Sequence, residues 1–328
     1  MLRKIKRTTS LILVILIAVY FLAINILASA LLKPSFMDKL DSFETLTEKG
    51  YGEQVYTDDI VSNEQESKNE LKEWLASTQW RKIAVMNDDG LKLVAAEFAQ
   101  PEDSDWVLLL HGYTGWKEEN YEFAKWYYEQ GYSVIAADSR AHGQSEGDVI
   151  GMGYTDVNDN LLWIKYILSV NPEATIILHG QSMGASAALM LTASDKLPDN
   201  VAACIADSAF TSAYDLFAGK LDDWTGIPDF LVMPALNITV KLRFGYSLKE
   251  ASALSAVSKS SIPTLFIHGS NDKIVPEEMS SRLFDSCSAQ IKKRLLIEGA
   301  GHVQSMYKNP ELYYKTISQF INNLQLKL

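Results

Sequence analysis

The chain has 328 residues, of which 47% are hydrophobic and 22% charged, a composition typical of a globular protein and unlike that of collagen-like or broadly disordered chains. Its formal net charge of −11 argues against a nucleic-acid partner, because an acidic surface repels phosphate backbones. The two cysteines are too few for a disulfide framework or a four-ligand zinc site.

An apolar run at residues 11–32 contains no charged residue. A helix that rises ~1.5 Å per residue would cross the ~30 Å hydrocarbon core of a bilayer over this length. Basic residues precede the run, so the positive-inside rule predicts a cytoplasmic tail at 1–10, a transmembrane signal anchor at 11–32 and an extracytoplasmic body. A cleaved signal peptide, which would release a secreted protein, is the alternative, because Ala28-Ser29-Ala30 has the form of a cleavage site. The length fits a buried helix of a soluble protein poorly.

Residues 33–79 are polar and acidic, and we expect a juxtamembrane spacer, helical near 64–76, that packs weakly on the domain. The domain itself is expected at 80–328. It begins with a β-hairpin, in which 81–86 and 91–98 flank an Asp-Gly turn.

Short apolar runs then alternate with helical patterns, which predicts a mostly parallel sheet covered by helices on both faces. The predicted strands are 106–110, 133–137, 174–178, 201–206, 264–267 and 294–297. The predicted helices are 117–130, 155–169, 184–194, 276–286 and 306–324. Residues 209–258 interrupt this alternation with an aromatic-rich insertion, which we expect to form a cap over the site.

The sequence Gly180-Gln181-Ser182-Met183-Gly184 lies between a predicted strand and a helix of small residues. A sharp turn at this place lifts a serine hydroxyl above the sheet edge, and the glycines allow the close backbone approach that the turn needs. The helix N-terminus directs its dipole and free N–H groups at developing negative charge. Ser182 is therefore the candidate nucleophile.

A serine nucleophile needs a base and an acid that orients the base. His302 lies in a glycine-rich loop after the last predicted strand, and it is the only histidine that follows both the serine and the preferred acid. Asp272 ends one predicted strand and is the preferred acid, while Asp207 ends the strand before it and is the alternative. The order Ser182, Asp272, His302 is nucleophile, acid, base.

An oxyanion hole needs two N–H donors near the serine. The Met183 amide, next to Ser182, supplies one, and the loop His111-Gly112-Tyr113-Thr114-Gly115 follows a strand that ends at the same edge of the sheet.

Five motifs occur in this order along the chain: HGYTG, DSRAHGQSEG, GQSMG, HGSNDKIVP and GAGHV. Through them the chain resembles the α/β-hydrolase superfamily of serine hydrolases over about residues 81–325. More narrowly, it is similar to bacterial members that are membrane-anchored or extracellular. The resemblance implies an α/β-hydrolase fold with a helical cap, Ser182 as nucleophile, Asp272 as acid and His302 as base. It likewise implies backbone oxyanion donors at Tyr113 and Met183.

The predicted function is hydrolysis of a carboxylic ester through an acyl-enzyme, with a small-molecule ester or acyl substrate and a lipid bilayer as the partners. No metal or other cofactor is expected, because no metal-binding or nucleotide-binding motif occurs. A serine peptidase would need an acid for a free amino terminus, and Asp222, Asp223 or Asp229 are candidates. The sequence is also compatible with an acyltransferase and with a catalytically silent membrane-anchored binding module.

Overall fold

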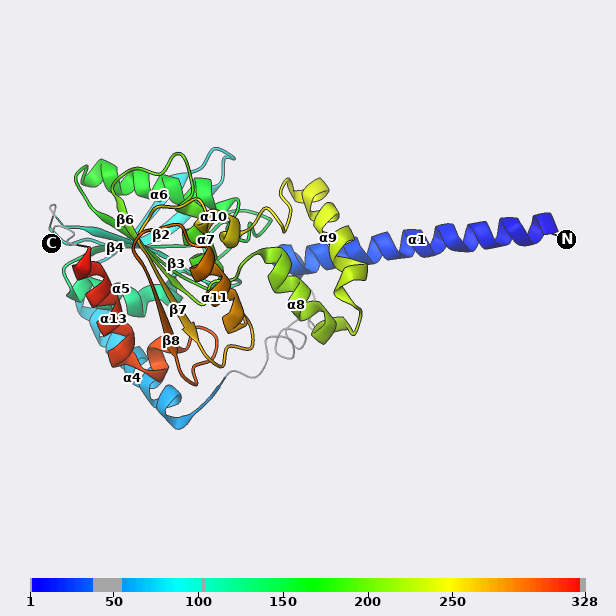
Figure 1. Cartoon of the computed structure of the whole chain (residues 1–328). Coiled ribbons are helices and arrows are strands. Elements are labelled where there is room, and N and C mark those ends of the chain that lie inside the picture. Colours follow the sequence, from blue (N-terminus) through cyan, green and yellow to red (C-terminus); the bar gives the residue numbers. More distant parts are fainter. Residues whose placement is uncertain (1, 38–54, 102–103, 325–328) are drawn as a thin grey trace.

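The computed structural model describes residues 2–37, 55–101 and 104–324, and within them an eight-stranded sheet forms the centre of the molecule (Figure 1). Its strand order is β1-β2-β4-β3-β5-β6-β7-β8. The pairs β1–β2 and β2–β4 are antiparallel, and all the other neighbours are parallel. The strands are β1 (Arg81–Met86), β2 (Lys92–Phe98), β3 (Trp106–Leu110), β4 (Ser133–Ala137), β5 (Ile176–Gln181), β6 (Val201–Asp207), β7 (Thr264–Gly269) and β8 (Lys292–Ile297). The predicted mostly parallel sheet is confirmed.

Helices cover both faces of this sheet, as the alternating pattern predicts. One face packs against α6 (Asp156–Val170), α7 (Met183–Leu191), α10 (Ala253–Val257) and α11 (Glu277–Ser286). The other face packs against α4 (Asp58–Ser77), α5 (Tyr121–Glu129), α12 (Ser305–Lys308) and α13 (Pro310–Asn323). A 3₁₀ helix, η1 (Lys117–Asn120), leads into α5. Strands β3 and β4 are buried along their whole length between these layers, which explains why their residues are apolar without alternation.

The expected weak packing of the spacer is wrong for its helical part. Ile60 is fully buried, and the Trp74 ring lies 5.0 Å from the ring of Phe98 on β2. An ion pair between Lys125 and Glu70 adds to this contact. Helix α4 is therefore an integral layer of the domain, and its narrow apolar face is sufficient because large aromatic side chains fill the interface.

The insertion between β6 and β7 forms α8 (Ala213–Thr225) and α9 (Asp229–Phe244), a helical pair next to the apolar N-terminal helix α1 (Leu2–Leu32) (Figure 1). The short α2 (Pro34–Met37) follows α1. Within α1 the segment Thr9–Leu32 is long and apolar enough to cross a membrane.

Helix α1 has two parts that differ in burial. Residues 11–23 are exposed, whereas Ile24, Ala28, Leu31 and Leu32 are buried in an apolar cluster with α8 and α9. The Leu32 carbonyl also accepts a hydrogen bond from Ile150 N, at 2.9 Å. The end of α1 is thus a packed part of the domain.

Candidate active site

Ser182 occupies a strained turn between β5 and α7. Its φ of 52° and ψ of −113° lie outside the regions that most residues adopt. A Cβ at Gly180 would lie 2.3 Å from the Gly184 carbonyl carbon, and a Cβ at Gly184 would lie 2.1 Å from the Leu110 carbonyl oxygen. Both positions therefore require glycine, because neighbouring backbone atoms leave no room for a Cβ. The turn is held in place by a 2.8 Å hydrogen bond from Ser182 N to Asp207 O.

The structure brings Ser182, His302 and Asp272 together in one chain of hydrogen bonds. The Ser182 hydroxyl donates to His302 Nε2 at 2.8 Å, and His302 Nδ1 donates to Asp272 Oδ2 at 2.7 Å. Each residue comes from the carboxyl end of a different strand, since Ser182 follows β5, Asp272 follows β7 and His302 follows β8. Parallel strands place these ends at one edge of the sheet, which is why residues so far apart in the sequence meet.

The carboxyl group of Asp272 is buried but is fully used as a hydrogen-bond acceptor. Oδ1 accepts from the backbone N–H groups of Ile274 and Val275, at 2.9 and 2.8 Å. Burial alone would raise the pKa of Asp272, but the neighbouring His302 and His268 outweigh it and hold that pKa well below its usual range. The group is thus a carboxylate at neutral pH.

Asp207, the alternative acid, forms different contacts. It accepts hydrogen bonds from the Ser208 hydroxyl and the Tyr313 hydroxyl, both at 2.9 Å. Burial raises its pKa. The structure therefore pairs His302 with Asp272 and places the Asp207 carboxyl in a separate buried network.

Sequence reasoning did not assign His268 to the site. Its Nε2 donates to Val275 O at 2.8 Å and lies 3.2 Å from Asp272 Oδ2, the same carboxylate oxygen that His302 contacts. Burial by itself would lower the pKa of His268, but the hydrogen bond with Asp272 raises it. The spacing of four residues between His268 and Asp272 was visible in the sequence, but the loop geometry that turns one toward the other was not.

The loop after β3 lies beside the serine. A Cβ built on Gly112 would lie 3.6 Å from the Ser182 Cβ. In the same loop, the backbone N–H of Thr114 donates to His142 Nε2 at 3.1 Å. Burial lowers the pKa of His142, so its ring is neutral and Nε2 can accept this hydrogen bond. Met183 is the first residue of α7, where backbone N–H groups have no partner within the helix.

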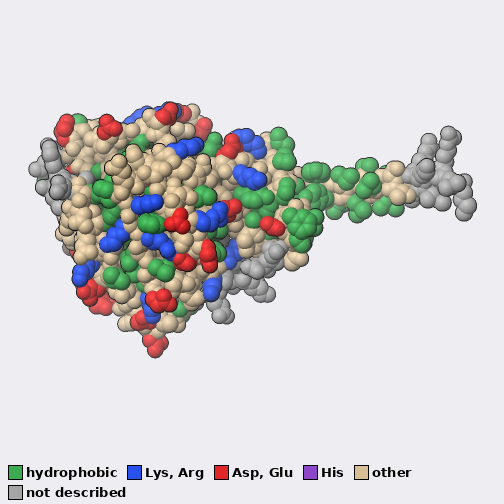
Figure 2. Space-filling model, viewed as in Figure 1, with side chains coloured by type: hydrophobic (Ala, Val, Ile, Leu, Met, Phe, Trp, Pro, Cys, Tyr) green, Lys and Arg blue, Asp and Glu red, His purple; other side chains and the backbone are tan. Residues whose placement is uncertain are grey.

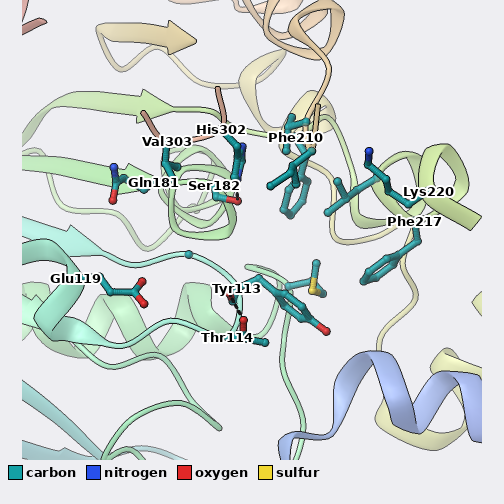
Figure 3. A pocket seen from close by; sticks show the side chains of 15 residues that line it. Tyr113, Thr114, Glu119, Gln181, Ser182, Phe210, Phe217, Lys220, His302 and Val303 are labelled. Carbon is teal, nitrogen blue, oxygen red and sulfur yellow. Dashed lines mark hydrogen bonds between the residues drawn. The ribbon is translucent and has the colours of Figure 1, made fainter. Parts of the chain in front are cut away.

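A pocket of about 300 Å³ opens at Ser182 and His302 (Figure 3). Its walls are mostly apolar, with the cap helix α8 contributing Leu216 and Phe217. Glu119 and Lys220 add charged groups to the lining, and neither was singled out from the sequence. Burial, and then the nearby Glu118, raise the pKa of Glu119.

Among the residues that the structure describes, no three His, Cys, Asp or Glu side chains group in a way that could hold a metal ion. Both cysteines, Cys204 and Cys287, are buried and free.

Two family models match consecutive parts of the chain. Residues 105–231 match the alpha/beta hydrolase fold model, and residues 232–305 match the model of the serine aminopeptidase family S33. The uncharacterized protein YqkD of Bacillus subtilis is 26% identical over 268 residues, which cover 81% of this chain and 87% of that protein.

Solved esterases share the fold. The esterase Pf2001 of Pyrococcus furiosus superimposes with a TM-score of 0.61 at 23% identity, covering 75% of this chain and 93% of that one. Est1E of Butyrivibrio proteoclasticus, solved with bound ferulic acid, gives a TM-score of 0.57 at 20% identity, covering 75% of this chain and all of Est1E. The chain is an α/β-hydrolase fold protein, and over residues 232–305 it is similar to the serine aminopeptidase family S33.

Proposed function

We propose that this hydrolase cleaves a carboxylic ester through an acyl-enzyme on Ser182, with His302 as base and Asp272 as the acid that orients it. The observation that carries the proposal is the pair of hydrogen bonds, 2.8 Å from Ser182 to His302 and 2.7 Å from His302 to Asp272. These distances are those expected for a nucleophile, its base and an orienting carboxylate.

In this mechanism His302 Nε2 takes the proton of the Ser182 hydroxyl as its Oγ attacks the ester carbonyl. The imidazolium that forms is stabilised by the ionised Asp272, and it then donates its proton to the departing alcohol. Water, deprotonated by His302, attacks the acyl-enzyme and releases the acid. The orientation of the ring depends on Asp272, which is itself fixed by the two backbone N–H groups of residues 274 and 275.

The tetrahedral intermediates carry a negatively charged oxygen, and in our proposal the backbone N–H groups of Tyr113 and Met183 donate hydrogen bonds to it. Tyr113 lines the pocket together with Ser182, and Met183 opens α7, so that the helix dipole adds to the field at the oxygen. One such donor is typically worth ~3–4 kcal/mol of transition-state stabilisation.

The lining of the pocket favours an acyl substrate. Phe210, Leu216, Phe217 and Val275 offer apolar surface close to Ser182. A sugar-sized polar substrate would leave its hydroxyl groups without partners against these walls.

Aminopeptidase activity is the second candidate, because the S33 family model matches residues 232–305, a stretch that includes Asp272 and His302. The side chains of Asp222 and Asp223 lie outside the described part of the structure, and Asp229 begins α9. Glu119 lines the pocket and offers a carboxylate that could hold a free amino group.

A panel of 4-nitrophenyl acyl esters, which release 4-nitrophenol, and aminoacyl 4-nitroanilides, which release 4-nitroaniline, tests the choice between the two activities. We expect turnover of the esters and little of the amides, and the reverse preference would make the chain a peptidase. Ser182→Ala is the control, because it must abolish either activity.

We also propose that residues 11–32 form an uncleaved signal anchor and that the body lies on the non-cytoplasmic side. The support is the basic group before the run and the burial of Leu31, which would be the first residue after cleavage. In intact spheroplasts, added protease should then degrade the body, and the mature N-terminus should precede residue 11. Protection of the body from protease would indicate the opposite orientation, with the body in the cytoplasm.

A further inference from the structure

The outer face of helix α9 carries an apolar stripe. Phe230, Ile238 and Leu242 are 69%, 58% and 81% exposed, and with the exposed Pro234 they recur every four residues along one side of the helix. We call these four residues the α9 stripe. Surface helices of soluble domains place polar side chains on the outer face, so an apolar stripe of this length indicates contact with another apolar phase.

The opposite face of α9 is also apolar, and it belongs to the core of the cap. Val232, Met233, Leu236 and Val240 are buried in the cluster that contains the ends of α1 and α8. The α9 stripe is therefore a second apolar face of this helix, because the first already packs against the rest of the cap.

Hydrogen bonds fix the level of α9 along the membrane helix. The Tyr20 hydroxyl donates to Leu231 O at 2.5 Å near the start of α9. Near its end, Arg243 donates to Asn25 O at 2.6 Å and to the Ser29 hydroxyl at 2.9 Å. The start of α9 thus lies nearer to the N-terminus of α1 than its end does.

The residues of α1 that contact the start of α9 lie within the length of helix that a membrane span requires. The shallowest placement of α1 starts the span directly after Arg7, and ~20 residues then cross ~30 Å and reach about residue 27. Tyr20 then lies ~10 Å inside the outer boundary of the hydrocarbon, and Asn25 ~3 Å inside it. A span that fills residues 11–32 would place α9 deeper. If α1 spans the bilayer, α9 cannot lie wholly outside it.

The chemistry of α9 follows the same gradient. Its deep end carries the exposed Phe230 and Leu231, whereas Lys241 and Arg243 lie at the end that reaches the boundary. Asp229 is the described charge nearest the deep end, and it lies in the first helical turn, where the helix dipole favours a carboxylate. A depth of ~5–10 Å is ordinary for interfacial helices. Figure 2 shows hydrophobic side chains continuing from α1 onto the adjoining part of the body.

The pocket lies next to the cap helix α8, which contributes Leu216 and Phe217 to its lining and packs against the inner face of α9. The Tyr113 hydroxyl donates to Leu31 O at 2.6 Å, which places the loop beside Ser182 ~6 Å beyond the level where α1 leaves the hydrocarbon. Tyr113 and Phe217 lie between Ser182 and α1 in Figure 3. An ester at the headgroup level, with its acyl chain still in the leaflet, would thus be near the serine.

We propose that the cap rests in the leaflet that faces the body, with the α9 stripe among the acyl chains, and that the substrate is an amphiphilic acyl ester drawn from that same leaflet. The second part rests on the proposed ester hydrolysis. The first part does not, because it depends only on α1, α9 and the contacts between them.

The test of placement uses the full chain in dioleoylphosphatidylcholine vesicles that contain lipids with a doxyl group on the acyl chain. A fluorophore on Ile238→Cys or Leu242→Cys should be quenched nearly as strongly as one on Leu22→Cys, an exposed position of α1 that the same count places ~8 Å inside the boundary, between the depths of the two ends of α9. A fluorophore on Ile291→Cys, which is 50% exposed on the body, should not be quenched. Equal, weak quenching at 238, 242 and 291 would overturn the placement of the cap, whatever the enzyme hydrolyses.

The test of the substrate compares 4-methylumbelliferyl oleate dissolved in the vesicles with water-soluble 4-methylumbelliferyl acetate. The triple variant Phe230→Ser, Ile238→Ser, Leu242→Ser should lose at least tenfold in oleate hydrolysis and retain acetate hydrolysis. A control with three exposed apolar residues changed elsewhere on the body (Met86→Ser, Ile291→Ser, Leu312→Ser) should hydrolyse both normally. Equal rates on oleate for the stripe variant and the wild type would refute delivery from the leaflet, whereas no hydrolysis of either ester by the wild type would refute the proposed activity instead.

Discussion

The substitution Asp272→Asn should change the tautomer of His302, and it should also replace by a donor the acceptor that His268 Nε2 faces at 3.2 Å. Oδ1 of Asp272 accepts two backbone N–H groups, at 2.9 and 2.8 Å, and only the carbonyl oxygen of an asparagine could replace it there. The amide nitrogen must then occupy the position of Oδ2, facing His302 Nδ1 at 2.7 Å. Because this nitrogen donates, Nδ1 must accept, and the ring proton moves to Nε2.

A ring protonated at Nε2 cannot take the proton of Ser182. We expect kcat for ester hydrolysis to fall by ~10⁴, which corresponds to about 5.5 kcal/mol in activation free energy. The matched control is Asp207→Asn, which we expect to lower kcat less than ~10-fold because Asp207 makes no hydrogen bond with His302. The assay is steady-state hydrolysis of a soluble ester, with thermal unfolding of both variants as the check on folding. A larger loss for Asp207→Asn than for Asp272→Asn would refute this account of the acid.

Two further predictions concern the fold around the site. Gly184→Ala should lower the free energy of unfolding by about 3 kcal/mol, because the new Cβ would lie 2.1 Å from Leu110 O. Gly219→Ala is the control, because a Cβ there meets open space, and this variant should be as stable as the wild type or more stable in urea unfolding. Burial, and then the nearby Asp159, raise the pKa of Asp156 to about 6. The folded state therefore holds this proton more tightly than the unfolded state, and wild-type stability should fall as pH rises from about 3 to about 7, by about 3 kcal/mol relative to Asp156→Asn. Parallel urea-unfolding profiles of the two proteins across this pH range would contradict the assignment.

The core strands were predictable because burial on both faces leaves a continuous apolar signal. Residues 106–110 and 133–137 were predicted with the bounds that β3 and β4 have. The prediction for β5 ended at 178, but the strand continues to Gln181, which pairs with Asp207. The polar and glycine residues at the end of β5 serve the turn at Ser182, so their composition does not indicate a strand.

Other features depend on contacts that a local pattern does not contain. The predicted helix 306–324 is divided into α12 and α13, because Pro310 cannot continue the first helix and Asn309 caps the second through Leu312 N. Thr155 occupies the N-cap position of α6, but its side chain makes no capping hydrogen bond. The packing of α1 against the cap joins segments more than 200 residues apart, so only the three-dimensional structure reveals it.

The candidate triad was visible from the order and the strand positions of its members. Ser182 and His302 each follow a strand and lie close to glycines. Asp272 and Asp207 both lie at the end of a predicted strand, and the resemblance to the family implied Asp272 as the acid. Sequence could not find Glu119 or Lys220, because they reach the pocket from η1 and from the cap through the tertiary fold.

The central claim is that Ser182 is the nucleophile, and covalent labelling tests it most directly. The full chain should react with a fluorophosphonate probe, and mass spectrometry of the digest should place the probe on the peptide that contains Ser182. Ser182→Ala should abolish labelling and lower ester turnover by ~10⁴–10⁶ while leaving the unfolding temperature unchanged. A probe found on another residue, or a Ser182→Ala protein that keeps a tenth of the wild-type turnover, would contradict the account.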